Sequence, residues 1–208
     1  MMIINPSYSQ KQVNLDVDND LYFDRDFYYS SGNFISYSSF KFNEGNSFID
    51  NFKLGQLIYT PSSRYETDPN KYDYPYSGYL FLESTRQLKI SDYSSFTIGG
   101  NIGITGDASL AKGMQNLYHD IVLNLPNLEW KSQMPQEFQI NLVVKFFKGF
   151  NLQDNINFTT EFYSRLGTYQ IMAGMNIGLL IGELQWFSLS NNICLLYTSD
   201  AADDDQCV

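Results

Sequence analysis

The sequence predicts an all-β protein, an antiparallel up-and-down transmembrane β-barrel with a short helix in its longest loop. Three observations support this fold class. Apolar and polar residues alternate over about eight segments, most of which reach the roughly 9–11 residues of a membrane-spanning strand. The polar faces contain Asn, Gln and Gly more often than Lys and Glu, which is typical of a confined lumen. Long and short links also alternate along the chain.

Composition and charge narrow the possible functions. The chain has 208 residues, of which 17% are charged and 16% aromatic, whereas roughly a quarter of an average soluble domain is charged. The formal net charge of -10 argues against nucleic acid as a partner, because binding it requires basic residues that neutralise phosphates. No apolar run approaches the length of about 20 residues that a membrane helix needs. The first residues lack the regions of a signal peptide, so either the protein is not exported or its start is missing.

Eight strands follow from the two-residue period of alternation. We expect them at about residues 11–20, 32–42, 53–60 and 77–89, then in a fifth segment that ends at Gly106, and finally at 137–148, 155–163 and from Tyr169 onward. A tight turn near Ser91 and Asp92 separates the fourth strand from the fifth.

The lengths of the links favour a membrane barrel. Long links follow the first, third and fifth strands, at about 21–31, 61–76 and 107–135, and shorter ones follow the second, fourth and sixth. In an up-and-down meander the long links lie at one rim, which is the loop asymmetry of outer-membrane barrels. A soluble sandwich or lipid-binding barrel would show the same alternation with its apolar faces inward. That alternative requires Phe138, Ile140 and Leu142 to be buried.

The longest loop contains the only histidine of the chain, His119. Beyond Gly106 the pattern changes from strand to helix. Asp107 is the expected N-cap, because its carboxylate can accept a hydrogen bond from a free amide of the first turn. Gln115 and His119 are four residues apart, so a helix places both on one face. A lone histidine in an arbitrary protein is more often structural than catalytic, and the neighbouring segments change that balance here.

Residues 194–208 are interpreted as a non-native tail. Their first part, Cys194-Leu-Leu-Tyr-Thr-Ser-Asp, matches the translation of a sequencing-library adapter in order and not only in composition. The alternative is an ordinary acidic and disordered C-terminus. We therefore expect a barrel domain over residues 1–193, which contains no cysteine.

Five segments at the long-loop rim resemble, as an ordered set, the outer-membrane lipid A 3′-O-deacylase family. They are Asn19-Asp20, Tyr29-Ser30-Ser31-Gly32, Gly55-Gln56-Leu-Ile-Tyr-Thr-Pro61, Lys71-Tyr-Asp-Tyr-Pro-Tyr-Ser-Gly-Tyr79 and the loop from Gly106 to His119. The resemblance covers nearly all of the chain to about Trp186. It implies a calcium-dependent esterase in a twelve-stranded barrel of the bacterial outer membrane, so we expect this C-terminally truncated chain to supply about eight of the twelve strands of the full-length protein. Such an enzyme releases the acyl chain esterified at the 3′ position of lipid A, the membrane anchor of lipopolysaccharide.

The resemblance also implies roles for particular residues, residue by residue. His119 corresponds to the catalytic histidine and Gln115 to the glutamine one helical turn before it. Ser30 corresponds to a hydroxyl residue near the site and Lys71 to a lysine there. Asn19 and Asp20 correspond to the acidic, cation-linked pair on the first strand. We expect a monomer that acts in the membrane.

The residue types suit ester hydrolysis. Histidine, with an unperturbed pKa of about 6.5, can activate a water molecule near neutral pH. A calcium ion bound by oxygen ligands can stabilise the developing oxyanion as a Lewis acid. The chain has no Gly-x-Ser-x-Gly motif, so a water nucleophile is preferred to an acyl-enzyme.

Two positions depart from the family pattern. Tyr74 stands where an arginine is common, and Leu125 stands near the place of an expected acid, for which Glu129 is the nearest candidate. The competing hypothesis is a non-catalytic outer-membrane barrel of the same ancestry.

Overall fold

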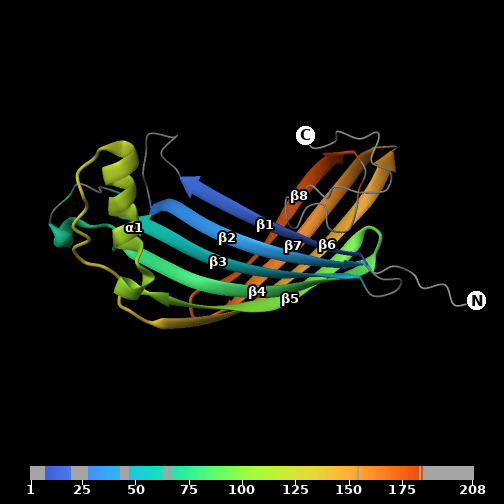
Figure 1. Ribbon diagram of the computed structural model, residues 1–208, viewed down its shortest axis with the longest axis horizontal. Coiled ribbons are helices and arrows are strands. Elements are labelled where there is room, and N and C mark those ends of the chain that lie inside the picture. The colour runs from blue at the N-terminus through green and yellow to red at the C-terminus, as the bar shows by residue number, and fades with distance from the viewer. Residues whose placement is uncertain are drawn as a thin grey trace, which may run out of the picture.

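Eight antiparallel strands form one sheet, in which every strand pairs with its neighbours in sequence order (Figure 1). The computed structural model describes residues 8–19, 28–42, 47–62, 66, 68–153, 155–182 and 184, with side chains from residue 11 on and without that of Asn19. The strands are β1 (Tyr8–Asn19), β2 (Tyr28–Phe42), β3 (Phe48–Thr60), β4 (Ser77–Ser91), β5 (Ser94–Thr105), β6 (Phe138–Gln153), β7 (Ile156–Gly167) and β8 (Ile171–Ile181). The predicted up-and-down order is confirmed.

The sixth strand is longer than its sequence pattern predicts. We expected it to end at Lys148, before a glycine, but β6 continues to Gln153 through a register shift after Asn151. Gly149 stays in the strand because its backbone amide donates to the carbonyl of Tyr93. The residue is a glycine because Leu184 lies so close that a side chain would not fit. A glycine in a strand therefore marks a close approach here and not an end.

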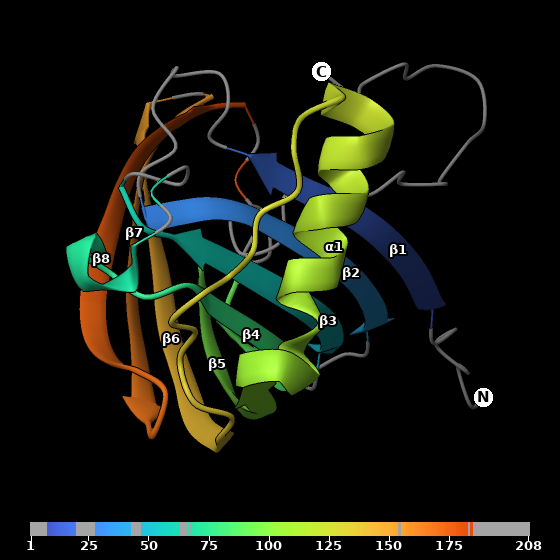
Figure 2. The same ribbon diagram turned by 90° about the vertical axis from the view of Figure 1, so that its left-hand side faces the viewer.

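The sheet is bent into a trough, so the described strands form about half of a barrel (Figures 1 and 2). In the described part of the chain β1 and β8 are the two edges of the sheet and do not pair with each other. Unpaired edges are not tolerated in lipid, because their amides and carbonyls have no hydrogen-bond partner there. A spanning barrel therefore requires further strands between β8 and β1.

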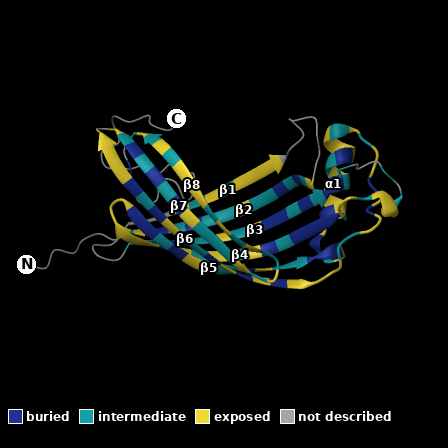
Figure 3. Ribbon diagram, turned by 180° about the vertical axis from the view of Figure 1, so that it is seen from behind, coloured by how far each residue is buried: buried dark blue, intermediate teal, exposed yellow. Residues whose placement is uncertain are grey.

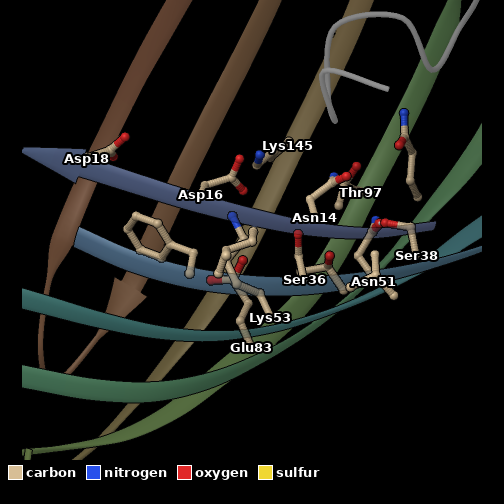
Figure 4. A pocket seen from close by; sticks show the side chains of 15 residues that line it. Asn14, Asp16, Asp18, Ser36, Ser38, Asn51, Lys53, Glu83, Thr97 and Lys145 are labelled. Atoms are coloured by element: carbon tan, nitrogen blue, oxygen red, sulfur yellow. The ribbon is translucent and has the colours of Figure 1, made fainter. Parts of the chain in front are cut away.

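The two faces of the sheet differ as a membrane barrel requires. Buried and exposed residues alternate along the strands (Figure 3). Phe138, Ile140 and Leu142 are exposed, so the alternative with reversed faces is wrong. The concave face encloses a cavity of about 700 Å³. Its lining is mostly polar and includes Asp16, Asp18, Ser36, Asn51, Lys53, Glu83, Thr85 and Lys145 (Figure 4).

A polar network crosses the concave face near the rim of the long loops. The Arg165 guanidinium pairs with the Glu83 carboxylate at 3.0 Å, and the Asn101 amide donates to the same carboxylate at 3.2 Å. The Asn101 carbonyl accepts from the Tyr79 hydroxyl and from the Asn141 amide, at 3.0 and 2.7 Å. The network thus joins β4, β5, β6 and β7 across the inside of the trough.

The links repeat the predicted asymmetry only in part. Residues 61–76 and 106–137 link strands at one rim, and the other rim has the two-residue turn at 92–93 and a short link between Gln153 and Ile156. The link from β7 to β8, at residues 168–170, is short although it lies at the long-loop rim. None of the described helices is long and apolar enough to cross a membrane.

Leu82 lies in the middle of β4, faces outward and is 50% exposed. Two arginine substitutions on this strand should therefore differ in their effect on the free energy of unfolding. Leu82→Arg places a charge in lipid and should lower the free energy of unfolding by about 2–4 kcal/mol. Thr85→Arg, on the lumen side of the same strand, is the matched control and should change it by less than about 1 kcal/mol. Urea titration of the full-length protein folded in vesicles measures both. Equal losses would contradict the assigned faces.

Candidate functional site

The helix of the longest loop, α1 (Ala111–Tyr118), runs directly into a π-helical turn at His119–Leu123. The prediction that Asp107 caps this helix is wrong. Asp107 lies in a 3₁₀ turn at Gly106–Ser109, and its carbonyl accepts from the amide of Leu110 at 3.1 Å. Leu110 adopts a left-handed conformation with φ of 59° and is the N-cap. The helix therefore begins at Ala111 and not directly after Asp107, because the 3₁₀ turn comes first and already provides a partner for the backbone amide of Leu110.

Helix α1 packs on the outer side of the barrel wall, at the ends of β3 and β4 (Figure 2). Glu83 and Thr85 line the cavity, so the two-residue period of β4 puts Gly78 on the outer face. A Cβ on Gly78 would overlap Ser109 Oγ and the Cβ of Ala111. The loop that starts the helix therefore touches the wall backbone, at a position where only glycine leaves room.

A second contact fixes the same loop to β3. Gln56, on the outer face of β3, donates from Nε2 to the Ser109 carbonyl at 2.7 Å. Its Oε1 is buried without a hydrogen-bond partner. The barrel wall thus holds the loop before α1 in two places: the Gln56 side chain of β3 bonds to it, and the Gly78 backbone of β4 packs against it.

An aromatic cluster on the outer wall positions Gln115. The Trp130 indole stacks on Tyr76 with ring centroids 5.0 Å apart, and Ile58, Ala111 and Leu128 complete a buried cluster. The indole Nε1 donates to Oε1 of the buried Gln115 at 2.7 Å. This bond fixes the orientation of the Gln115 side-chain amide, so that its Nε2, which carries the two N–H donors, points away from the indole.

His119 is 3% exposed, and its ring is oriented by the returning chain. Nδ1 lies 3.2 Å from the carbonyl oxygen of Pro126. A carbonyl can only accept, so Nδ1 carries the proton and Nε2 carries the lone pair of the neutral ring. Asn116 holds the same returning segment through two bonds to the backbone of Leu128, at 2.9 and 3.1 Å. The arrangement leaves Nε2 as the basic atom.

Ser30 reaches the outer side of the wall through a β-bulge. Phe34, Ser36 and Ser38 of β2 line the cavity, so an unbroken strand would also turn Ser30 inward. The register shifts between Tyr29 and Ser31, and the Ser30 hydroxyl instead lies 2.7 Å from that of Thr60. Thr60 has the outward register of Ile58, so the hydroxyl pair lies on the same side of the wall as α1.

The structure brings some of the predicted site residues together and not others. Asn19 ends β1 opposite Ser31, at the same rim as α1, while Asp20 lies outside the described residues. Lys71, with its side chain 65% exposed, pairs with Glu66 at 3.6 Å on the surface of the 61–76 link. In the described part of the chain no three His, Cys, Asp or Glu side chains gather as metal ligands.

The two departures from the family pattern have local partners of their own. Glu129 pairs with Lys131, which holds the pKa of the Glu129 carboxyl below its usual range. The backbone amide of Leu125 donates to the carbonyl of His119 at 3.1 Å. Tyr74 packs edge-on against Tyr28, with ring centroids 6.0 Å apart. Glu129, the acid nearest to Leu125 in the sequence, is thus engaged by a lysine.

The sequence analysis placed Gln56, Thr60 and Gly78 in the rim segments but predicted no contact for them, and it did not identify Trp130. Gln56 and Gly78 contact the loop that starts α1, Trp130 bonds to Gln115, and Thr60 holds Ser30. One signal was present. The outward series of β3 includes the apolar Phe52 and Leu54 in the middle of the strand, and the buried polar residues Gln56 and Thr60 follow toward its end. Polar residues on the outer face of a spanning strand need a protein partner, because lipid provides none.

The fold and the outward position of the site define an outer-membrane β-barrel whose loop helix packs against its own outer wall. A family model described as "Outer membrane protein LpxR" matches residues 1–193, and the chain belongs to this family. The fold is also similar to the solved structure of LpxR from Salmonella typhimurium, with a TM-score of 0.67 at 20% identity. That match covers 82% of this chain and 63% of the Salmonella chain. A comparison with curated proteins finds no match.

The close approach at Gly78 predicts opposite effects of two glycine substitutions. Gly78→Ala should displace α1 and cost roughly 1–3 kcal/mol of local stability, because the added methyl group overlaps Ser109 and Ala111. Gly113→Ala, in the same helix with open space around it, should stabilise α1 by about 1 kcal/mol. Hydrogen exchange of residues 111–118 distinguishes the two. Slower or unchanged exchange in Gly78→Ala would contradict the packing described.

Proposed function

We propose that this protein hydrolyses the ester-linked 3′ acyl chain of lipid A, with His119 as the general base that activates water. The observation that supports this most directly is the buried imidazole, whose Nδ1 is bonded to Pro126 so that Nε2 is basic. A structural histidine needs no particular tautomer, whereas a base needs its lone pair directed at the reacting water.

The place of the helix supports a lipid substrate. Lipid A lies in the outer leaflet, so its esters reach the protein from the outer side of the barrel and not from the lumen. Gln115, His119, Ser30 and Thr60 all belong to the outer side, next to the ends of β2 and β3. A polar site between the barrel wall and a helix gives a lipid ester access without passage through the barrel.

The amide nitrogen of Gln115 is proposed to donate to the substrate or to the attacking water, one helical turn from His119. Lys71 is proposed to provide positive charge to the phosphate-bearing headgroup, because its side chain is exposed on a loop of the same rim. Ser30 is proposed to orient the reacting groups through its hydroxyl, which Thr60 holds in place.

Calcium is proposed as the cofactor. The residues fit in kind, since Asn19, Asp20 and Ser30 carry oxygen donors of the type that calcium prefers, and Asn19 and Ser31 are paired at one rim. When bound, the ion would supply positive charge that stabilises an oxyanion. Asp20 would provide the charge and Ser30 a neutral oxygen.

We further propose that residues 1–193 are the barrel part of the chain and act as a monomer once further strands close it. Activity therefore has to be tested in the full-length protein. A non-catalytic barrel is the second candidate. It is favoured by Leu125, which stands where an acid was expected, and by Glu129, which is engaged by Lys131.

The proposed base predicts a specific loss of activity. His119→Ala should lower the deacylation rate by roughly 10²–10⁴-fold, the usual contribution of a general base. Lys112→Ala, on the exposed side of the same helix, should leave the rate unchanged. Mass spectrometry of lipid A after incubation with calcium or with a chelator measures the loss of one acyl chain. No mass change with the unaltered protein and calcium would establish the non-catalytic alternative.

The hydrogen bond from Trp130 to Gln115 predicts that a substitution outside the catalytic residues also lowers the reaction rate, though less than His119→Ala does. Trp130→Phe keeps the stack on Tyr76 and removes only the indole donor, which leaves Oε1 of Gln115 buried without a partner. Such a group costs about 1–3 kcal/mol. We expect a lower kcat, together with a free energy of unfolding in urea that falls by no more than this amount. An unaltered kcat would show that the orientation of Gln115 is irrelevant to the reaction.

A further inference from the structure

Helix α1 has an apolar stripe on the side that does not face the barrel. Leu110, Met114, Leu117 and Ile121 follow one another at intervals of four, three and four residues, the spacing of side chains on one helical face. Met114 and Leu117 lie in α1 itself, Leu110 is its N-cap and Ile121 lies in the π-helical turn. Their exposed fractions are 65%, 42%, 52% and 73%. Apart from the small Ala111, the residues that face the wall or the returning loop are instead polar, namely Gln115, Asn116 and His119.

This distribution is the reverse of that of a surface helix in water. Such a helix turns its apolar stripe to the protein and its polar residues to solvent. Four large exposed side chains in one line are typical of a surface that contacts a membrane or another molecule. The stripe therefore needs an apolar environment, and the protein itself does not provide one.

The position of the helix identifies that environment. Helix α1 packs on the outer side of β3 and β4, which is the side that faces lipid in an outer-membrane barrel. The helix also runs across the direction of the strands, and therefore along the plane of the membrane (Figure 1). Its stripe is therefore exposed on the same side of the wall as outward apolar residues such as Leu82 and Ile102.

We propose that the stripe of Leu110, Met114, Leu117 and Ile121 inserts into the acyl-chain layer of the outer leaflet. Helices of this kind lie in the membrane interface with the apolar face buried to about 5–10 Å. Insertion places Gln115 and His119, on the polar side of the same helix, at the depth where ester groups lie. This last step rests on the proposed function, whereas the insertion itself does not.

Spin labels measure the depth directly. Met114→Cys, Leu117→Cys and Lys112→Cys are made one at a time in the full-length protein without other cysteines, labelled with a nitroxide and folded into phosphatidylcholine vesicles. Ile102→Cys, on the lipid side of β5, is the membrane reference. Lys112 lies about half a helical turn away from the stripe and is the aqueous reference.

We expect the ratio of collisions with oxygen to collisions with a water-soluble nickel chelate to be at least about fivefold higher at Met114 and Leu117 than at Lys112, and similar to that at Ile102. If the ratio of oxygen to nickel-chelate collisions at Leu117 is as low as that at Lys112, the proposal is wrong. Because all the labelled side chains are exposed, the variants keep the packing of the helix. The oxygen ratio at Ile102 shows in each preparation that the barrel is inserted.

A second measurement links the stripe to the reaction. Leu117→Asp should lower deacylation of lipid A in vesicles by about tenfold and leave deacylation of detergent-dispersed lipid A within about threefold. Equal losses with both substrates would overturn the link between insertion and access to the ester. If the unaltered protein removes no acyl chain at all, the proposed function fails, while the spin-label result still decides whether the stripe inserts.

Discussion

The close contact between the loop helix and the outer barrel wall determines the rest of the site. At Gly78 the wall offers a backbone without a side chain, and Ser109 and Ala111 occupy the space. Gln56 then holds the Ser109 carbonyl, and the cluster around Trp130 and Tyr76 covers the joint. Gln115 and His119 follow on the same helix, so their positions depend on where the helix first touches the wall.

This contact also explains why polar residues are found on the outer surface of a membrane protein. The barrel buries its own polar groups on the concave side, in a network that includes Glu83, Arg165 and Asn101. Near the rim the outer wall is polar as well, at Gln56 and Thr60, because a helix and a returning loop cover it. The helix in turn places its apolar residues on the remaining side, toward lipid. Each surface is matched to its neighbour, and the polar site lies between two protein layers.

The sequence was sufficient for the strands but not for the site. Alternation is a local property, so residues such as Leu82 and Ile140 could be assigned to faces without knowledge of the fold. The spacing of Gln115 and His119 also sufficed to place them on one helical face. The side of the wall on which the helix packs could not be predicted, because Gly78 reads as an ordinary strand glycine and its partner Ser109 is thirty-one residues away. The helix start was misplaced because a 3₁₀ turn and the left-handed Leu110 separate Asp107 from the helix.

The bulge in β2 has a consequence for how this family tolerates insertions and deletions. One extra residue between Tyr29 and Ser31 exchanges inside and outside for the end of the strand, so Ser30 turns to Thr60 and Tyr29 turns to Asp18 in the lumen. Removal of Ser30 would restore a regular ladder in which Tyr29 stays opposite Tyr59 and Tyr28 stays opposite Thr60, so the flanking residues would keep their faces and only the hydroxyl on the outer side would be lost. Sequence alignments of relatives should therefore be judged at this point by whether the extra residue is present, since a gap of one residue here removes a site residue without changing the faces of its neighbours.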